Sequence, residues 1–266
     1  MGTVDLSGRR ILVVGASSGI GRAFARLAVM EGADVVVAAR RRRALEELVE
    51  EAGGGRIVTA DLAVAGDCTR LGQTAGEMLG AIDIVLFCAG VGELQRVELQ
   101  TQQDWMQTYA VNVVGVNLTI AAVLAALAPR AIVATMSTES VGRPHWGLAS
   151  YAASKAALEE SFRSWRIEHP EFRFTVIPIG STIPTEFGKT FRQEVLLEAF
   201  EKWAHAGMQT EMMEVGDVAA AVIQTLAVVL PSPSAGIEQL VIRPAAAVTG
   251  SADVYIRTAE ENQLLD

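Results

Sequence analysis

Hydrophobic residues along the chain fall into short unbroken runs that alternate with longer stretches of mixed character. The runs at Arg10–Val14, Asp34–Ala39 and 82–88 are rich in Val, Ile and Leu and stop at Gly or polar residues. Such runs are typical of parallel strands buried on both faces. Residues 19–31 instead repeat apolar side chains at helical spacing and end at Gly32, which predicts a helix.

The alternation continues and predicts about seven strands in one doubly wound, Rossmann-like α/β sheet with helices on both faces. No linker rich in Pro, Gly or Ser divides the chain, so residues 1–266 are interpreted as a single domain. The looser region 180–216 is expected to hold one or two helices, and its variable part lies around 183–215. The remaining strands are expected at 56–59, 131–136, 172–178 and 238–242, and the remaining helices at 42–51, 65–80, 101–109, 112–128, 149–169 and 217–230.

One apolar segment has the length of a borderline membrane span. Residues 111–128 contain no charge over 18 positions. Polar or flexible residues interrupt the segment at Asn112, Gly115 and Asn117, and Pro129 follows it. We therefore expect a helix buried in the core or between subunits, and no membrane partner.

The composition narrows the class of protein. The net charge of −9 argues against nucleic acid and anionic membranes as partners. The two cysteines, Cys68 and Cys88, are too few for a disulfide framework and are expected to be buried thiols in a reducing compartment. No metal-ligand cluster surrounds them, so no metal is expected. The N-terminus lacks the apolar core of a signal peptide, and these features together predict a cytoplasmic protein.

A glycine-rich turn joins the first predicted strand to the first predicted helix. It reads Gly-Ala-Ser-Ser-Gly-Ile-Gly from Gly15 to Gly21. Glycine lets the backbone approach a phosphate, and a helix N-terminus favours its negative charge, so the turn predicts a dinucleotide site. The alternative is that a tight strand-to-helix turn needs glycine for its own geometry. The candidate cofactor residues here are Gly15, Ser17, Ser18, Gly19, Ile20 and Gly21.

Tyr151 and Lys155 are a candidate catalytic pair. Four residues apart on a helix, they share a face. A free tyrosine has a pKa of about 10, and a neighbouring ammonium is expected to lower it. Tyr151 is thus a candidate proton donor in carbonyl reduction and proton acceptor in alcohol oxidation. The alternative is an interfacial tyrosine beside a solvated lysine.

These motifs, in this order, resemble the short-chain dehydrogenase/reductase family almost end to end. The resemblance implies an oxidoreductase that transfers a hydride between a nicotinamide cofactor and a carbonyl or secondary alcohol, with Tyr151 as general acid and base. It also implies that Lys155 hydrogen-bonds the nicotinamide ribose and that Asn112 holds a water in a proton relay. The motifs that carry it are Gly15 to Gly21, Asp61-Leu62, Cys88-Ala89-Gly90, Asn112-Val-Val-Gly115 and Tyr151-Ala-Ala-Ser-Lys155.

The resemblance assigns further cofactor contacts, and the chain departs from the family at two of them. Phe87-Cys88 stands where the family has two asparagines, and Ile179 separates the usual Pro-Gly pair. Asp61 and Thr185 have an alternative role as helix N-caps, and Asn112 one as a partner for local backbone. The contacts implied are Asp61, Leu62, Ala89, Gly90, Tyr151, Lys155, Gly180, Thr182 and Thr185.

The catalytic hydroxyl is a third departure from the family. The family's serine most often stands 13 residues before the tyrosine, and that position is Thr138. Thr138 can donate a hydrogen bond to a carbonyl as serine does, although its methyl group takes space. Ser137 and then Ser140 are the alternatives, and Glu139 is expected to face away.

The end of the second strand predicts the choice of nicotinamide. Ala39 occupies the position where NAD-preferring members carry Asp, and Arg40 to Arg43 follow. Guanidinium suits a 2′-phosphate, so NADP(H) is preferred over NAD(H), with Arg40 as the main contact and Arg41 beside it. The alternative, a solvated start to a surface helix, explains Arg42 and Arg43 but not the missing acid.

Apolar residues in 187–213, with His145 and Trp146, predict a small hydrophobic carbonyl or alcohol as substrate. They serve equally well to bury the segment itself or a subunit contact. By resemblance, helices 112–128 and 149–169 build a homodimer or homotetramer. Two other functions stay open: a non-catalytic NADP(H)-binding sensor, which the Thr138 substitution allows, and a double-bond reductase or dehydratase on the same fold. The residues of 187–213 that are expected to line the substrate site are Phe191, Phe200, Trp203, His205, Met208, Met212 and Met213.

Overall fold

A six-stranded parallel sheet forms the centre of the protein. The computed structural model describes residues 4–208, 211–232, 234–245, 256 and 260–261. The strand order is β3-β2-β1-β4-β5-β6, which is the doubly wound arrangement expected from the sequence. The strands are β1 (Arg10–Val14), β2 (Asp34–Ala39), β3 (Arg56–Thr59), β4 (Ile82–Phe87), β5 (Leu127–Thr138) and β6 (Arg173–Ile179).

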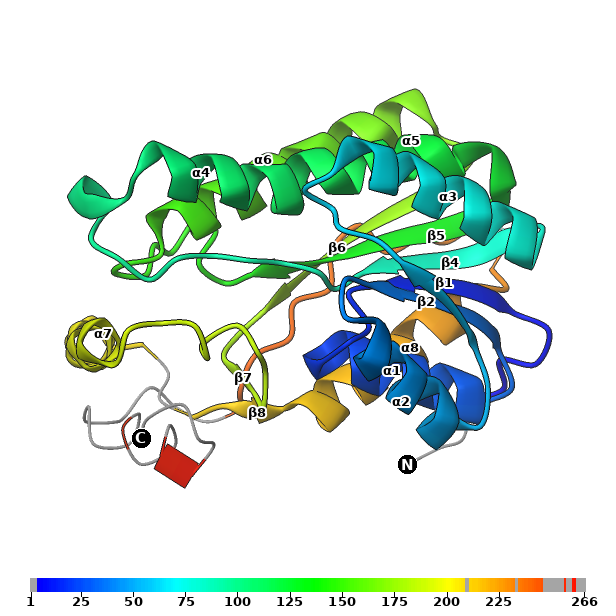
Figure 1. The fold of residues 1–266 in the computed structure, drawn as a ribbon. Helices are drawn as coiled ribbons and strands as arrows, with labels where there is room; N and C mark the ends of the chain where they lie inside the picture. Colours follow the sequence, from blue (N-terminus) through cyan, green and yellow to red (C-terminus); the bar gives the residue numbers. More distant parts are fainter. Residues whose placement is uncertain (1–3, 209–210, 233, 246–255, 257–259, 262–266) are drawn as a thin grey trace.

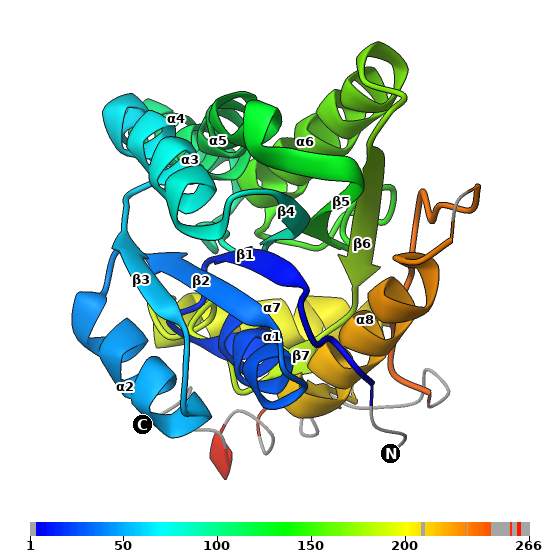
Figure 2. The same cartoon turned by 90° about the vertical axis from the view of Figure 1, so that its right-hand side faces the viewer.

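Helices cover both faces of the sheet because side chains of each strand alternate between two cores. In β1, Leu12 and Val14 enter one core, and Ile11 and Val13 enter the other. Figures 1 and 2 show the covering helices in two layers, one on each face of the sheet. The first layer holds α1 (Gly19–Met30), α2 (Arg42–Ala52) and α8 (Val215–Val229), and the second holds α3 (Ala65–Leu79), α4 (Gln102–Tyr109), α5 (Val116–Val123) and α6 (Ala149–Glu168).

The predicted seventh strand at 238–242 is present only as isolated bridges to β6. Val176 pairs with Gln239 and Ile179 pairs with Ile242, both in parallel. The amide of Val176 donates to Glu238, but Pro178 has no N–H for the next bond of the ladder. Pro178 accepts from Ile242 through its carbonyl alone, so the segment follows β6 without forming a regular strand.

The predicted helix 112–128 ends earlier than expected. A π-helical segment, Ala110–Gly115, links α4 to α5, and a 3₁₀ turn at Leu124–Ala126 leads into β5 at Leu127. Pro129 disfavours helix before it, and β5 changes register there beside Arg130, whose φ is 61°. The helical stretch Gln102–Ala126 is long and apolar enough to cross a membrane, and 39% of its most apolar window is buried inside the protein.

The region 180–216 carries one helix within its described residues, as expected. It holds β7 (Thr182–Ile183), α7 (Gln193–His205) and β8 (Met213–Glu214), and β7 pairs with β8. Figure 1 shows α7 standing apart from both helix layers. Its buried side chains form a third, smaller apolar cluster with Leu94 and Leu148. This cluster is one wall of the cavity described next.

Candidate active site

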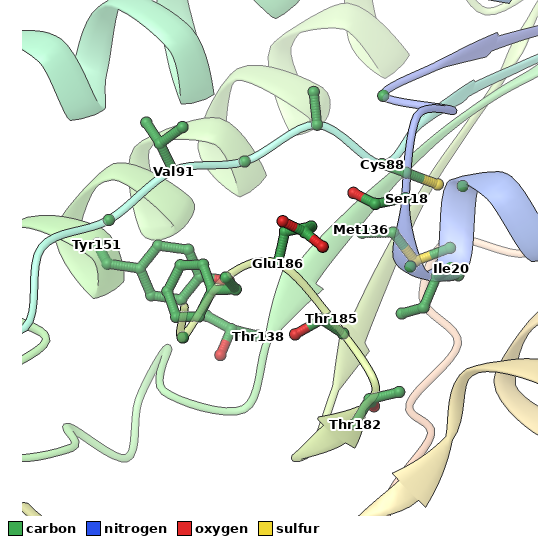
Figure 3. A pocket seen from close by; sticks show the side chains of 18 of the residues that line it. Ser18, Ile20, Cys88, Val91, Met136, Thr138, Tyr151, Thr182, Thr185 and Glu186 are labelled. Atoms are coloured by element: carbon green, nitrogen blue, oxygen red, sulfur yellow. The ribbon is translucent and has the colours of Figure 1, made fainter. Parts of the chain in front are cut away.

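A cavity of about 540 Å³ opens at the carboxyl ends of the central strands. It lies where β1 and β4 adjoin, the point at which the strand order reverses and where doubly wound sheets bind ligands. Six parts of the chain supply most of its wall: the glycine turn, the end of β5 with α6, the segment after β6, and the ends of β2, β3 and β4. Figure 3 shows Ser18 and Ile20 from the first part, Thr138 and Tyr151 from the second, and Thr185 and Glu186 from the third.

The glycine turn is tight and leaves the start of α1 open to the cavity. Gly15 has a φ of +92°, and a Cβ there would collide with the backbone nitrogen of Ala89. Ser18 is the N-cap of α1, and its side chain makes no capping hydrogen bond. The first amides of α1 therefore need an external acceptor, and a phosphate of a dinucleotide fits there. This arrangement meets the requirement of the predicted cofactor site.

The two candidate arginines behave differently. The Arg41 guanidinium donates to the hydroxyls of Ser17 at 3.1 Å and Ser18 at 2.9 Å. It also pairs with Glu186, with 3.4 Å between Nη1 and Oε2, so it joins the glycine turn to the segment before α7. Arg40 lines the same cavity, is exposed, and has no hydrogen-bonding partner among the described residues. Arg41 rather than Arg40 thus contacts the turn directly.

The other expected cofactor residues lie in the cavity wall, but the expected N-caps are wrong. Asp61 accepts a hydrogen bond from the amide of Ala63, and the N-cap of α3 is Val64. The N-cap of α7 is Arg192 and not Thr185. The residues found in the wall are Gly15, Ser17, Ser18, Gly19, Ile20, Gly21, Arg40, Arg41, Asp61, Leu62, Ala89, Gly90, Gly180, Thr182 and Thr185.

Asn112 lies in the π-helical segment and is fully buried rather than part of the cavity wall. Its amide spans the backbone of Val91, accepting from the nitrogen at 2.9 Å and donating to the oxygen at 2.7 Å. It also donates to Ser154 on α6 at 2.9 Å. Val91 lies 21 positions before Asn112 in the chain, so Asn112 does not serve the backbone of its own helix, which was the alternative role considered from the sequence. Asn112 thereby holds the loop after β4 against the helix that carries Tyr151; its relay role stays a prediction.

Tyr151 and Lys155 point into the cavity from α6. The ammonium of Lys155 is 3% exposed, donates to the carbonyl of Met136 at 2.9 Å, and lies 6.0 Å from the centre of the Tyr151 ring. Burial lowers the pKa of Lys155 to about 8. Burial also raises the pKa of Tyr151 to about 12 and outweighs the hydrogen bond with Thr138. The expectation of a lowered tyrosine pKa is therefore wrong for this structure, because desolvation dominates.

The three candidate hydroxyls differ in their hydrogen-bonding partners. The hydroxyl of Thr138 is hydrogen-bonded to that of Tyr151 and lies 3.1 Å from that of Ser140. The hydroxyl of Ser137 instead donates to the buried carboxylate of Glu159. Thr138 is thus beside Tyr151, with Ser140 behind it, and Ser137 is engaged elsewhere.

Glu139 lines the cavity, so it does not face away as expected, and its side chain reaches the segment that carries Arg243. Its carboxylate lies 3.6 Å from the guanidinium of Arg243. Burial raises its pKa, and the charges of Arg243 and Arg143 oppose that rise. The negative charge next to Thr138 is therefore partly compensated by cations on neighbouring segments.

The wall opposite the glycine turn is largely apolar. The ring centres of Tyr151 and Phe187 lie 4.6 Å apart with the rings tilted by 47°, and those of His145 and Trp203 lie 6.0 Å apart. Burial lowers the pKa of His145 to about 4, so its imidazole is neutral near pH 7. Trp146, His205 and Met213 were expected in this wall but do not line it. The side chains that do are Met136, His145, Leu148, Phe187, Phe191, Leu196, Phe200, Trp203, Met208 and Met212.

Sequence reasoning missed two acids near the site. Glu186 bridges Arg41 and Lys189, with 2.9 Å to the latter, and no local motif marks it. Glu159 follows Lys155 by one helical turn, and a carboxylate on the same face as a catalytic lysine was a signal that could have identified it.

Comparisons with known proteins agree with this geometry. The sequence model of a family described as short chain dehydrogenase matches residues 9–195. Glycine betaine reductase ATRR of Emericella nidulans is 32% identical over 83% of this chain. Oxidoreductase asL5 of Sarocladium schorii is 29% identical over 81% of this chain and 88% of its own length. The chain spans only 18% and 22% of the length of the first two curated relatives it matches, ATRR being one of them.

Solved structures share the fold. A short chain dehydrogenase from Burkholderia cenocepacia, determined in complex with NADP, superposes with a TM-score of 0.75. It is 24% identical, and the match covers 93% of this chain and 99% of the other. At this identity the likeness concerns the path of the backbone.

Proposed function

Because this chain belongs to the short chain dehydrogenase family, we propose that it is an oxidoreductase that transfers a hydride between NADP(H) and a carbonyl or secondary alcohol. The observation that carries the proposal is the meeting, in one cavity, of an uncapped helix start behind the glycine turn with the hydroxyls of Tyr151 and Thr138. The first suits the phosphates of a dinucleotide, and the second suits a reacting oxygen.

In carbonyl reduction, Tyr151 donates a proton to the substrate oxygen while the hydroxyl of Thr138 donates a hydrogen bond to the same atom. The ammonium of Lys155 stabilises the phenolate that forms. Asn112 keeps the loop at Val91 in place and so sets one side of the cavity. The bound nicotinamide supplies or accepts the hydride.

The preference for NADP(H) is supported by charge at the end of β2. Arg40 and Arg41 both line the cavity, and Ala39 offers no carboxylate to a ribose 2′-hydroxyl. Arg41 binds two hydroxyls of the glycine turn, and this contact supports a role for its guanidinium toward a 2′-phosphate. Exposed Arg40 is free to complete a bidentate clamp.

The substrate proposed is small, uncharged and hydrophobic. Among described residues, the cavity wall away from the glycine turn contains no arginine, and its lysine is Lys155 beside Tyr151. A carboxylate or phosphate on the substrate would therefore meet no cation there other than Lys155, whose ammonium is engaged with Met136 and serves Tyr151. Aromatic side chains at Phe187, Phe191 and Trp203 suit an aromatic or alicyclic body.

A homodimer or homotetramer is also proposed. Helix α4, the π-helical segment and α5 expose apolar side chains on one face: Met106 is 64% exposed, Val114 52% and Leu118 37%. These residues surround a groove of about 270 Å³ that is almost entirely apolar. A second copy of the same face would cover it, as the family resemblance implies.

The test combines cofactor titration with turnover. NADPH should bind more tightly than NADH by fluorescence, and a panel of uncharged aliphatic and aromatic ketones should contain substrates. Tyr151→Phe should lower kcat by roughly 10²- to 10⁴-fold with NADPH binding unchanged. Tight NADPH binding without turnover on any carbonyl, and no effect of Tyr151→Phe, would instead support a non-catalytic sensor.

A further inference from the structure

A carboxylate lies buried on the helix that carries the catalytic pair. Glu159 is 7% exposed, and its Oε1 accepts a hydrogen bond from Ser137, which is 1% exposed. One turn earlier on α6, Lys155 donates to the carbonyl of Met136. These two buried charged side chains of α6 are therefore anchored on consecutive residues of β5.

Burial of either charge is costly unless something compensates it. Three titratable side chains face Lys155: Cys88 at the end of β4, and Tyr151 and Glu159 on α6. Burial raises the pKa of both Cys88 and Tyr151 to about 12, so both are neutral near pH 7. Glu159 is thus the group among these three that brings a negative charge to the lysine.

We infer that Glu159 is a positioning residue of the active site, whose carboxylate, anchored by Ser137, keeps Lys155 protonated beneath Tyr151. The inference rests on the proposed oxidoreductase function, in which that ammonium stabilises the tyrosine phenolate. The carboxylate acts through its field, because its hydrogen bond goes to Ser137 and that of the ammonium goes to Met136. Ser137 then serves Glu159 and not the substrate, which accounts for a polar pair deep in the apolar layer.

A direct test measures the protonation of Lys155 without turnover. The chain has three lysines, so acetic anhydride labelling followed by peptide mass spectrometry reads each one separately, with exposed Lys189 and Lys202 as internal references. In Glu159→Gln, Lys155 should become reactive about one pH unit lower than in the parent protein. Glu159→Leu, a second uncharged variant, should give the same shift.

The adjacent Glu160 offers a matched control because it is exposed and pairs with Arg163. Glu160→Gln should leave the labelling curve of Lys155 unchanged. Glu159→Asp keeps the carboxylate, so its labelling curve should lie close to that of the parent protein rather than to that of Glu159→Gln. A purely structural Glu159 would lower the melting temperature of Glu159→Gln without moving the labelling curve, and that result would overturn the inference.

Turnover supplies an independent readout. The high-pH limb of carbonyl reduction should move down by about one pH unit in Glu159→Gln, with kcat on the low-pH side nearly unchanged. An unmoved limb contradicts the inference even if the variant is less stable. If the parent protein reduces no carbonyl, the proposed function fails, and the labelling experiment still decides the role of Glu159.

Discussion

The two ends of the cavity are built in different ways. At the glycine turn the wall is backbone: Gly15 and Gly21 sit where any Cβ would meet other main-chain atoms, and the amides of α1 face inward. At the far end the wall is side chain, with Phe187, Trp203 and His145 brought together from separate segments.

This difference divides binding into a general and a specific part. Backbone amides recognise phosphate in any dinucleotide and allow little variation in sequence. Apolar side chains recognise shape, and each can change without disturbing the sheet, because their cluster is separate from the two main cores. Substitutions at the two ends should therefore fail in different ways.

The largest effect is expected at Gly15. In Gly15→Ala, the new Cβ would collide with Ala89, and its φ of +92° is strained for alanine, so NADPH affinity should fall by more than about 100-fold. Gly8→Ala is the matched control, since Gly8 has a φ of +72° and no atom within 4 Å of the added Cβ. Titration by fluorescence quenching measures both; equal losses in the two variants would trace the effect to backbone strain alone.

Thr138 lies where the two ends meet. Thr138→Ala should lower kcat roughly tenfold to a thousandfold, because the Thr138 hydroxyl is hydrogen-bonded to Tyr151 and is proposed to donate to the substrate oxygen. NADPH binding should stay intact. Ser140→Ala should cost less, since Ser140 reaches Tyr151 only through Thr138. Steady-state kinetics on one ketone compares them. Full activity in Thr138→Ala would transfer the role to one of the serines.

Substitution of Arg40 and Arg41 tests whether side chains add to cofactor binding at the glycine-turn end of the cavity, where the rest of the wall is backbone. Arg41→Ala should weaken NADPH binding roughly tenfold to a hundredfold by removing a charge-assisted contact, and leave NADH binding nearly unchanged. Arg40→Ala should also weaken NADPH binding, but by less than Arg41→Ala does. A clear preference of the parent protein for NADH would refute the assignment of both residues.

The smallest effect concerns His145 in the side-chain wall. Its pKa is about 4 in the folded protein against about 6.5 unfolded, so the stability it contributes is present above pH 6.5 and is lost as pH falls toward 4. At pH 5 the loss should be about 2 kcal/mol. His145→Phe should remove that part of the acid destabilisation in urea unfolding at pH 7 and pH 5; identical pH dependence in both proteins would show that the imidazole titrates normally.

Much of the fold could be predicted because its signals are local. Strand β1 and helix α1 follow from a buried run and a 3.6-residue period, and the glycine turn follows from contiguous residues. Errors arose where a proline, in the partner strand or just beyond a helix, breaks the main-chain pattern. Pro178 interrupts the pairing of 238–242, and Pro129 ends the helix after α5, both through main-chain effects that hydrophobic pattern does not record.

The predictions about the site separate in the same way, between signals that are local in the sequence and contacts that form only in the fold. The sequence by itself determined the glycine turn and the Tyr151–Lys155 pair, since both rest on spacing along the chain, and the family resemblance added the candidacy of Thr138. Only the tertiary structure decided that Ser137 faces Glu159, that Arg41 and not Arg40 binds the turn, and that desolvation raises the pKa of Tyr151. Burial and through-space partners set those outcomes, and both depend on segments distant in sequence that meet only when the sheet and its two helix layers have formed.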